Sequence, residues 1–255
     1  IFLEGNLNCK FIDDKPAATR AIFRDVTARI SAEKALQNQQ EQTERLLLNI
    51  LPASIVNRLK QEPGTIAEHF DDVTVLFADI VGFTQIATSV SATTLVHLLN
   101  QIFSVFDRLS LKYGLEKIKT IGDAYMLVGG LPTRSSNHPQ TVALMALEMQ
   151  NAIKTFNKRN NLNLSIRIGI HTGSVVAGVI GLQKFTYDLW GNTVNIASRM
   201  ESHGISGKIQ VTEETYKRLQ NKFILEKRGE ISIKGRGLMT TYLLTGKREE
   251  VISND

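Results

Sequence analysis

The stretch KIKTIGDAYM, residues 117–126, places a Gly-Asp turn between two runs in which apolar residues alternate with other side chains. This alternation predicts two β-strands, and the Gly-Asp pair between them predicts a tight hairpin turn. Asp123 then lies at the hairpin tip, and Lys119 lies four residues earlier on the first strand. The rest of the sequence has to explain why a structural hairpin carries an acid and a base at these positions.

The segments on either side of the hairpin predict strands and helices in an order typical of one fold. A buried strand is expected to end near Asp79, and an amphipathic helix is expected over 93–114. After the hairpin, residues 139–159 predict a second helix and 164–173 a further central strand. This order is that of a ferredoxin-like split βαβ core, with helices on one face of the sheet. Residues 209–246 add short strands and one helix, so the predicted fold class is α+β (α/β sandwich).

The first 66 residues have a different character. Residues 1–27 contain two short strand-like runs around the turn DDKPA, which is too little to fold alone. Residues 28–50 are rich in Ala, Glu, Gln, Leu and Arg and lack Gly and Pro, which predicts a long helix. Three residues at seven-residue intervals form a narrow seam along it: Leu36, Thr43 and Ile50. The seam favours a parallel two-stranded coiled coil, and a helix packed on its own domain is the alternative. A second amphipathic segment, 53–61, follows.

The distribution of charged residues indicates which classes of partner the chain could bind. The formal net charge is +5, and residues 1–50 hold seven basic and seven acidic side chains, so the whole surplus lies beyond residue 50. That surplus favours an anionic partner, although a mildly basic soluble domain would also account for it. The basic residues form no run and do not alternate with aromatic residues, so we expect no nucleic-acid partner.

Cysteine content and hydropathy indicate the compartment. The single cysteine, Cys9, excludes an internal disulfide and a cysteine metal cluster, and it suits a reducing compartment. No apolar run approaches the roughly 18 residues that a membrane helix needs, so we expect no membrane contact by this segment. The chain begins at Ile1 without a signal sequence, which indicates a piece of a longer protein. We therefore expect a cytoplasmic segment whose anchor, if the protein has one, lies elsewhere.

Two carboxylates in the predicted sheet indicate a metal site. Asp79 and Asp123 would come from adjacent central strands, where two carboxylates repel each other unless a cation lies between them. Oxygen ligands without His or Cys suit Mg²⁺ or Mn²⁺, and two such ions can activate an attacking oxygen and hold a leaving phosphate. Asp123 alone would be an ordinary turn residue. A carboxylate that interrupts an apolar strand is costly without a partner, so Asp79 favours the functional interpretation.

Three stretches together, VTVLFADIVGFT, KIKTIGDAYM and YDLWGNTVNIASRM, resemble the class III nucleotidyl cyclase catalytic domain. The resemblance runs from about Phe70 to Gly246 and implies formation of a 3′,5′-cyclic nucleotide and pyrophosphate from a nucleoside triphosphate. It implies that Asp79, Asp123 and the Ile80 carbonyl oxygen bind two Mg²⁺ or Mn²⁺ ions. It also implies a homodimer with sites at its interface, where one subunit supplies the metals and the other the base and transition-state contacts.

The same resemblance assigns three further residues. Asn195 would orient the ribose, and Arg199, four residues later on the same helix face, would stabilise charge around the α-phosphate. Lys234 would hold the terminal phosphates, although without the family it would be interpreted as a solvated loop lysine. Some relatives place a further phosphate contact where this chain has Ser174, so triphosphate binding would depend more on Lys234 and the metals.

Hydrogen bonding predicts the base. Adenine presents an acceptor at N1 and a donor amine at N6, so its pocket needs one donor and one acceptor, which Lys119 and Asp188 supply. Guanine presents the reverse pattern, and guanylate-forming members of the family carry Glu and usually Cys at these positions. The sequence therefore predicts an adenylate cyclase that acts on ATP. A guanylate cyclase and a catalytically silent nucleotide-sensing dimerisation module are the alternatives.

The N-terminal part resembles the end of a sensor domain. The stretch FRDVTARISAEKAL is similar to the last strand of a PAS domain and the helix that follows it. The expected division is a PAS-like end at 1–27, a signalling helix and transducer segment at 28–66, a catalytic domain at 67–247 and a tail at 248–255. An upstream sensor would then regulate the catalytic dimer through the helix.

Overall fold

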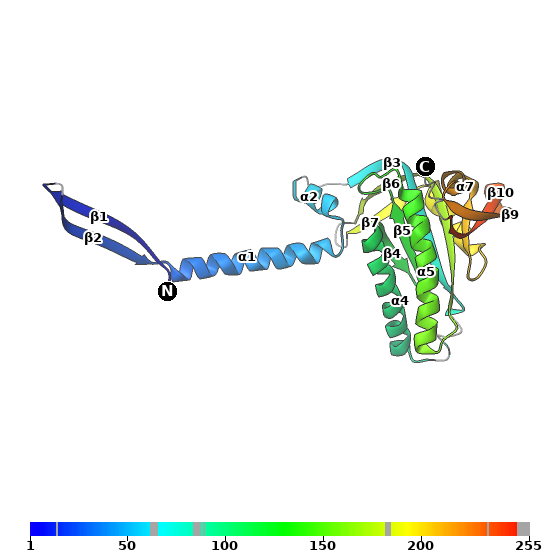
Figure 1. The fold of residues 1–255 in the computed structure, drawn as a ribbon, viewed down its shortest axis with the longest axis horizontal. Coiled ribbons are helices and arrows are strands. Elements are labelled where there is room, and N and C mark those ends of the chain that lie inside the picture. Colours follow the sequence, from blue (N-terminus) through cyan, green and yellow to red (C-terminus); the bar gives the residue numbers. More distant parts are fainter. Residues whose placement is uncertain are drawn as a thin grey trace, which may run out of the picture. The chain divides into compact units, whose positions relative to one another are not determined.

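The computed structural model describes residues 1–13, 15–61, 66–83, 88, 90–181, 185–233 and 235–248. The chain divides into two units, Ile1–Pro63 and Gly64–Asp255. Each unit has its own sheet, and Figure 1 shows the strands and helices of both.

The first unit consists of a hairpin and two helices. Strands β1 (Leu3–Ile12) and β2 (Lys15–Asp25) pair antiparallel and are exposed along their length. Helix α1 (Thr27–Leu48) buries none of its residues, and α2 (Ala53–Gln61) follows it. The strands are longer than the sequence runs suggested, because the hairpin pairing extends to Leu3.

The predicted long helix is present, but it ends before the last position of the predicted seam. Helix α1 stops at Leu48, and Ile50 lies in the turn after it, where its N–H donates to the Leu47 carbonyl. Pro52 explains the stop, since proline disfavours helical backbone at the residue before it. Leu36 is 57% exposed on the helix. Pairing of this helix with a second copy stays a prediction.

The second unit is built on one mixed sheet. Among the residues that the structure describes, eight strands form it: β3 (Ile66–Val81), β4 (Glu116–Ile121), β5 (Ala124–Gly129), β6 (Ser165–Ile180), β7 (Thr186–Trp190), β8 (Ile209–Thr212), β9 (Phe223–Ile233) and β10 (Gly237–Lys247). The strand order is β4-β5-β3-β6-β8-β10-β9, with β7 paired to β6. In the run β4-β5-β3-β6 each strand is antiparallel to its neighbour, which is the ferredoxin-like order. The predicted α+β fold is thereby confirmed.

Four helices of the described residues cover the sheet: α4 (Ala92–Tyr113), α5 (His138–Asn160), α6 (Asn192–Ser202) and α7 (Glu213–Leu219). In Figure 1, α4 and α5 lie side by side across the sheet, and the two helices contact each other. The core lies beneath them, where alternate residues of β6, Ile166, Ile168 and Ile170, are fully buried. Burial of one such side chain stabilises the fold by about 1.5–3 kcal/mol.

The predicted ends of α4 agree with its capping residues. Ser91 caps the first turn, since its side chain accepts a hydrogen bond from the Thr94 N–H. Gly114 ends the helix in the left-handed conformation with φ of 62°, which glycine adopts without steric cost. The next residue, Leu115, is buried in the core, so the cap directs the chain straight into β4.

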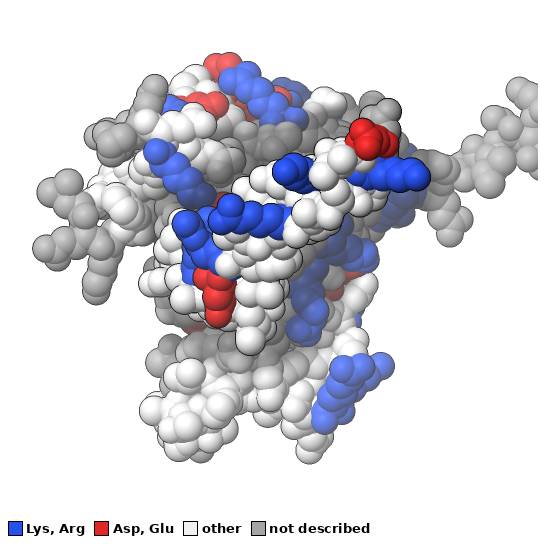
Figure 2. Space-filling view, turned by 90° about the vertical axis from the view of Figure 1, so that its left-hand side faces the viewer, with Lys and Arg blue, Asp and Glu red and all other residues white. Residues whose placement is uncertain are grey.

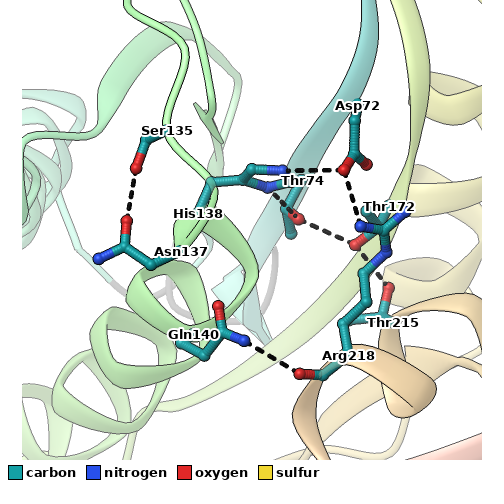
Figure 3. A network of polar contacts seen from close by, with 9 residues as sticks. All are labelled: Asp72, Thr74, Ser135, Asn137, His138, Gln140, Thr172, Thr215 and Arg218. Carbon is teal, nitrogen blue, oxygen red and sulfur yellow. Dashed lines mark hydrogen bonds and ion pairs between the residues drawn. The ribbon is translucent and has the colours of Figure 1, made fainter.

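A buried chain of hydroxyl groups, with Thr74 in the middle of β3, joins four elements (Figure 3). Thr74 contacts the His138 ring nitrogen and the Thr172 hydroxyl at 2.8 Å each, and Thr172 contacts Thr215 at 3.0 Å. Burial lowers the pKa of His138, so its ring is neutral near pH 7. The chain ties β3, β6, α5 and α7 together and satisfies polar groups that the core would otherwise leave unpaired.

Glu116, the first residue of β4, is partly buried, and burial raises the pKa of its carboxyl group from 4.5 to about 7. The unfolded chain loses this proton near pH 4.5, so ionisation costs folding free energy as the pH rises from 4.5 through 7. Glu116→Gln removes that cost. We therefore expect the variant to gain stability relative to the parent on going from pH 5 to pH 8, by on the order of 1–2 kcal/mol after discounting for exposure. Urea unfolding of both proteins at the two pH values measures the difference, and an equal effect at both would contradict it.

Basic side chains are prominent on part of the surface. On the face that Figure 2 shows, Lys and Arg side chains are more conspicuous than Asp and Glu side chains, in keeping with the formal charge of +5. Such a surface favours anionic ligands. None of the described helices combines the length and the apolar character that crossing a membrane requires.

Candidate active site

The two predicted metal ligands lie next to each other in the sheet. Asp79 on β3 pairs with Ala124, the first residue of β5, and Asp123 immediately precedes Ala124 in the hairpin turn. Burial, and then the neighbouring Asp123 carboxylate, raise the pKa of Asp79, and Arg167 offsets part of the rise. Two carboxylates that destabilise each other's charge are stabilised by a cation between them, so their placement fits divalent metal ions.

The ligand set fits Mg²⁺ or Mn²⁺ only together with a substrate. No group of three or more His, Cys, Asp or Glu side chains with metal-binding geometry occurs in the described part of the chain. Mg²⁺ commonly uses one or two carboxylates and completes its shell with water and substrate phosphates. The Ile80 side chain is buried in the core, so only its backbone carbonyl could contribute to the site, and metal binding by that carbonyl stays a prediction. Two carboxylates and a carbonyl therefore suit ions that arrive with a triphosphate.

Sequence reasoning missed two charged residues beside Asp79. Arg167 on β6 pairs with Asp79 across the sheet, and its Nη2 donates to Asp79 Oδ2 at 3.2 Å. Arg167 Nε donates to Glu201 Oε1 on α6 at 2.7 Å. Burial raises the pKa of Glu201, and the Arg167 hydrogen bond lowers it in part. Arg167 interrupts the apolar run SIRIGI, and that signal, already used for Asp79, would have identified it.

Gly169 explains how α6 reaches these residues. A Cβ at Gly169 would lie 2.0 Å from the Glu201 backbone nitrogen and 2.5 Å from the Met200 carbonyl carbon. Only a glycine therefore lets α6 rest directly on β6. Arg167 and Gly169 are two apart on one strand and so share a face, which places α6 on the face that carries Asp79. The sequence predicted helices on one face of the sheet. Helices α4 and α5 do share one face, but α6 covers the opposite face.

Gly169→Ala should destabilise the fold, because backbone atoms rather than a flexible side chain would have to move. We expect a loss of about 1–3 kcal/mol of unfolding free energy and a matching loss of any activity that depends on α6. Gly246→Ala is the matched control, because its Cβ would lie 3.7 Å from Ile224 Cδ1, which is ordinary contact. Thermal and urea unfolding measure the difference, and equal stability of the two variants would contradict the close approach.

Asn195 and Arg199 lie on the exposed side of α6, whereas Ile196 and Met200 are buried beneath the helix. The spacing of four residues puts both polar side chains on one helix face, as predicted. They open into a hollow of about 440 Å³. Its lining residues are Asn192, Asn195, Ile196, Ser198, Arg199, Ile233, Gly235 and Arg236.

The predicted phosphate ligand Lys234 lies outside the described residues. Its neighbours Ile233, Gly235 and Arg236 line the hollow. Arg236 thus adds a cation that the sequence interpretation did not assign. Two arginines in a hollow of this size suit an anionic ligand.

Lys119 and Asp188, which are 69 positions apart in the sequence, are in direct contact. Lys119 Nζ on β4 donates to Asp188 Oδ2 on β7, and Asp188 Oδ1 accepts from the Leu189 N–H at 2.9 Å. The side chains are 35% and 16% exposed, so both are partly withdrawn from water. The structure therefore brings together the donor and the acceptor that the base-recognition hypothesis requires.

On one chain the site residues fall into separate groups. The carboxylates Asp79 and Asp123 lie at the ends of β3 and β5, and the Lys119–Asp188 pair joins β4 to β7. No residue of these two groups is among those that line the hollow at Arg199. The carboxylates suit metal ions, the Lys119–Asp188 pair suits a base, and the hollow at Arg199 suits an anion.

His171, in the run GIHTG, serves the fold. Its Nδ1 contacts the Thr212 hydroxyl at 2.8 Å, and burial lowers the pKa of the ring to about 4. The imidazole is therefore neutral near pH 7 and bonded within the sheet.

Comparison with known proteins identifies related chains. Residues 65–246 match the family model described as adenylate and guanylate cyclase catalytic domain. An adenylate cyclase of Mycobacterium tuberculosis is 46% identical over 218 residues, which are 85% of this chain and 49% of that protein. The guanylate cyclase soluble subunit beta-2 of Rattus norvegicus is 44% identical over 208 residues, which are 81% of this chain and 30% of that protein. The chain thus spans at most about half the length of these relatives.

A solved structure of a cyclase domain is also similar to this chain. The guanylate cyclase domain of RhGC from Catenaria anguillulae, in complex with GTP, superposes with a TM-score of 0.69 at 36% identity. The match covers 71% of this chain and all of that domain. Relatives of both base specificities are therefore similar to this chain.

Proposed function

The chain belongs to the family of adenylate and guanylate cyclase catalytic domains, and from this premise we propose that it is an adenylate cyclase. It would convert ATP to 3′,5′-cyclic AMP and pyrophosphate. The observation that carries the choice of base is the contact between Lys119 and Asp188. A guanylate cyclase is the second candidate, because relatives of that specificity are nearly as similar in sequence.

The contact supports adenine through its hydrogen bonds. An ammonium group offers three donors and a carboxylate offers only acceptors. Lys119 would donate to adenine N1, and Asp188 would accept from the N6 amine. A guanine in the same place would present its N1–H to the ammonium and its O6 to the carboxylate, leaving both partly buried charges opposite like groups.

The residues around the phosphates have distinct tasks. Asp79, Asp123 and the Ile80 carbonyl would hold two Mg²⁺ or Mn²⁺ ions, which when bound lower the pKa of the ribose 3′-hydroxyl and neutralise the leaving pyrophosphate. Asn195 would hold the ribose in position for attack on the α-phosphorus. Arg199 would donate to the α-phosphate oxygens as charge develops there.

The outer phosphates would have their own contacts. Lys234, together with Arg236 two residues later in the sequence, would bind the terminal phosphates of ATP. Of these two cations, Arg236 lines the hollow at Arg199. This arrangement would compensate for the Ser174 side chain, which carries no charge.

A homodimer would unite the separate groups. One subunit would supply Asp79 and Asp123, and the other would supply the base-reading and transition-state residues, so that a symmetric dimer has two complete sites. Apolar side chains at β6 and β7 support this arrangement, because Val176 and Trp190 pair across the two strands and are 36% and 37% exposed. Exposed apolar groups beside a polar site are typical of a protein interface.

The N-terminal unit would transmit a signal. We propose that residues 1–27 end a PAS-like sensor and that α1 and α2 couple it to the catalytic dimer, in a cytoplasmic protein. Deleting residues 1–48 should then change basal activity by severalfold or alter dimer affinity. Initial rates and sedimentation of the shortened and full chains measure both quantities. Unaltered rate and unaltered dimer affinity would contradict transmission by this helix.

Product analysis tests the proposed function. The purified chain is incubated with ATP or GTP and with Mg²⁺ or Mn²⁺, and the products are separated by chromatography. Cyclic AMP and pyrophosphate from ATP are the expected products. Cyclic GMP as the main product would contradict the assignment of the base, and no cyclic nucleotide from a demonstrated dimer would favour the silent nucleotide-sensing module.

A further inference from the structure

The ion pair between Arg167 and Glu201 connects α6 to the metal-binding carboxylate of the same chain. Arg167 Nη2 lies 3.2 Å from Asp79 Oδ2 and 2.7 Å from Glu201 Oε1. The side chains of Arg167, Asp79 and Glu201 are 26%, 22% and 10% exposed. Ion pairs of this limited exposure are screened by salt much less than surface pairs are.

Two glycines, Gly169 and Gly204, leave the space that Arg167 and α6 occupy. Gly169 lets the backbone of Glu201 rest on β6. A Cβ at Gly204 would lie 2.8 Å from Arg167 Cγ and 3.1 Å from its Cδ, so this glycine leaves room for the arginine stem. The stem of Arg167 therefore packs directly against the backbone at Gly204, and its guanidinium bonds both Asp79 and Glu201.

Charge explains why the arginine needs an acid behind it. A guanidinium next to Asp79 would by itself repel a divalent cation that binds the same carboxylate. Glu201 carries the compensating negative charge, because two N–H groups of the same guanidinium edge face its Oε1. A carboxylate has about four acceptor positions, so one contact from Arg167 leaves Asp79 with capacity for a metal ion.

We propose that Arg167 and Glu201 are positioning residues for the metal-ligating Asp79. Arg167 fixes the orientation of the Asp79 carboxylate, and Glu201 anchors Arg167 and cancels its charge. The inference rests on the proposed metal site and goes beyond it, because it adds two residues that would touch neither ATP nor the ions. Loss of a residue that orients a metal ligand typically lowers metal affinity or activity by about 10- to 100-fold.

Metal binding is measured first, with an ATP analogue that lacks the 3′-hydroxyl present throughout. Mn²⁺ is titrated into the parent chain and into Glu201→Gln and Arg167→Lys, and binding is followed by electron paramagnetic resonance. The dissociation constant for Mn²⁺ should rise about 10-fold or more in both variants, measured at a temperature at which thermal unfolding shows both to be folded. Arg218→Lys is the matched control, since Arg218 pairs with Asp72 at 2.7 Å in the network of Figure 3. Affinities within twofold of the parent in both variants would overturn the proposal.

Mixed dimers show which half of the site the pair serves. A chain with Asp123→Ala lacks a metal ligand, and a chain with Arg199→Ala lacks the transition-state arginine, so their mixed dimer has one complete site. Glu201→Gln is then added to either chain. Activity should fall only when the change is in the Arg199→Ala chain, which supplies the metal ligands. A fall only when it is in the other chain would mean that Glu201 acts by holding α6, and would overturn the proposal.

The parent chain separates this inference from the proposed function. If the parent forms no cyclic nucleotide and Asp123→Ala leaves its Mn²⁺ affinity unchanged, the proposed function fails. If the parent forms cyclic AMP and binds Mn²⁺ through Asp123, while Glu201→Gln binds Mn²⁺ like the parent, only the inference about the Arg167–Glu201 pair fails.

Discussion

Asp123→Ala is expected to lower the rate of cyclic AMP formation by about 10³-fold or more. Asp123 lies beside Asp79 at the end of the hairpin, and losing one of two metal carboxylates would remove roughly 4 kcal/mol of transition-state stabilisation. The change lies in a turn outside the core, so folding should be unaffected. Initial rates with saturating ATP and Mn²⁺, together with thermal unfolding, measure the two effects separately.

The control for this variant is Asp71→Ala, at an exposed acid on the same strand, β3. It should retain nearly full activity, because Asp71 lies eight residues, about 26 Å of extended strand, from Asp79. If Asp123→Ala retained more than a tenth of the parent activity with a normal fold, two-metal catalysis at this hairpin would be excluded. If the chain were a silent sensor, neither variant would form cyclic nucleotide, and Asp123→Ala would lose only nucleotide binding.

The second large effect concerns the base. The double variant Lys119→Glu with Asp188→Cys should shift the preference of kcat/KM from ATP towards GTP by about 10³-fold or more, because it replaces two matched hydrogen bonds by their opposites. The two side chains contact each other, so their changes are coupled. Kinetics of parent and variant with both nucleotides measure the ratio.

Each single substitution serves as a control for the double variant. Lys119→Glu would place two acids in contact, and Asp188→Cys would leave the partly buried ammonium unpaired, so each should lose activity with both nucleotides. Only the double variant presents a set of hydrogen-bonding groups in which both positions match guanine. An unchanged ATP preference in a folded, active double variant would show that other residues select the base.

The sequence predicted the parts of the site that depend on local pattern. The hairpin placed Asp123 beside the end of the strand that carries Asp79, and helical spacing put Asn195 and Arg199 on one face. Complementary hydrogen bonding to adenine paired Lys119 with a residue 69 positions away, which the structure brings into contact. The resemblance to the cyclase family supplied the roles of Asn195 and Arg199, and it agreed with the hydrogen-bond argument for Lys119 and Asp188.

The residues that the sequence reasoning missed depend on contacts between distant segments. Arg167 meets Asp79 because of the register of β6 against β3, and Glu201 meets Arg167 because Gly169 admits α6 closely. A single sequence does not reveal strand register or the height of a helix above a sheet. The end of α1 was misplaced for a local reason, since the heptad pattern continued to Ile50 although Pro52 ends the helix earlier.

An equimolar mixture of the Asp123→Ala and Arg199→Ala chains tests the central claim most directly. Each variant alone should form almost no cyclic AMP from ATP. The mixture should recover about a quarter of the parent activity, because about half of the dimers are mixed and each of these has one complete site of two. No recovery, from chains that sedimentation shows to exchange subunits, would contradict an adenylate cyclase whose site is shared between two copies of this chain.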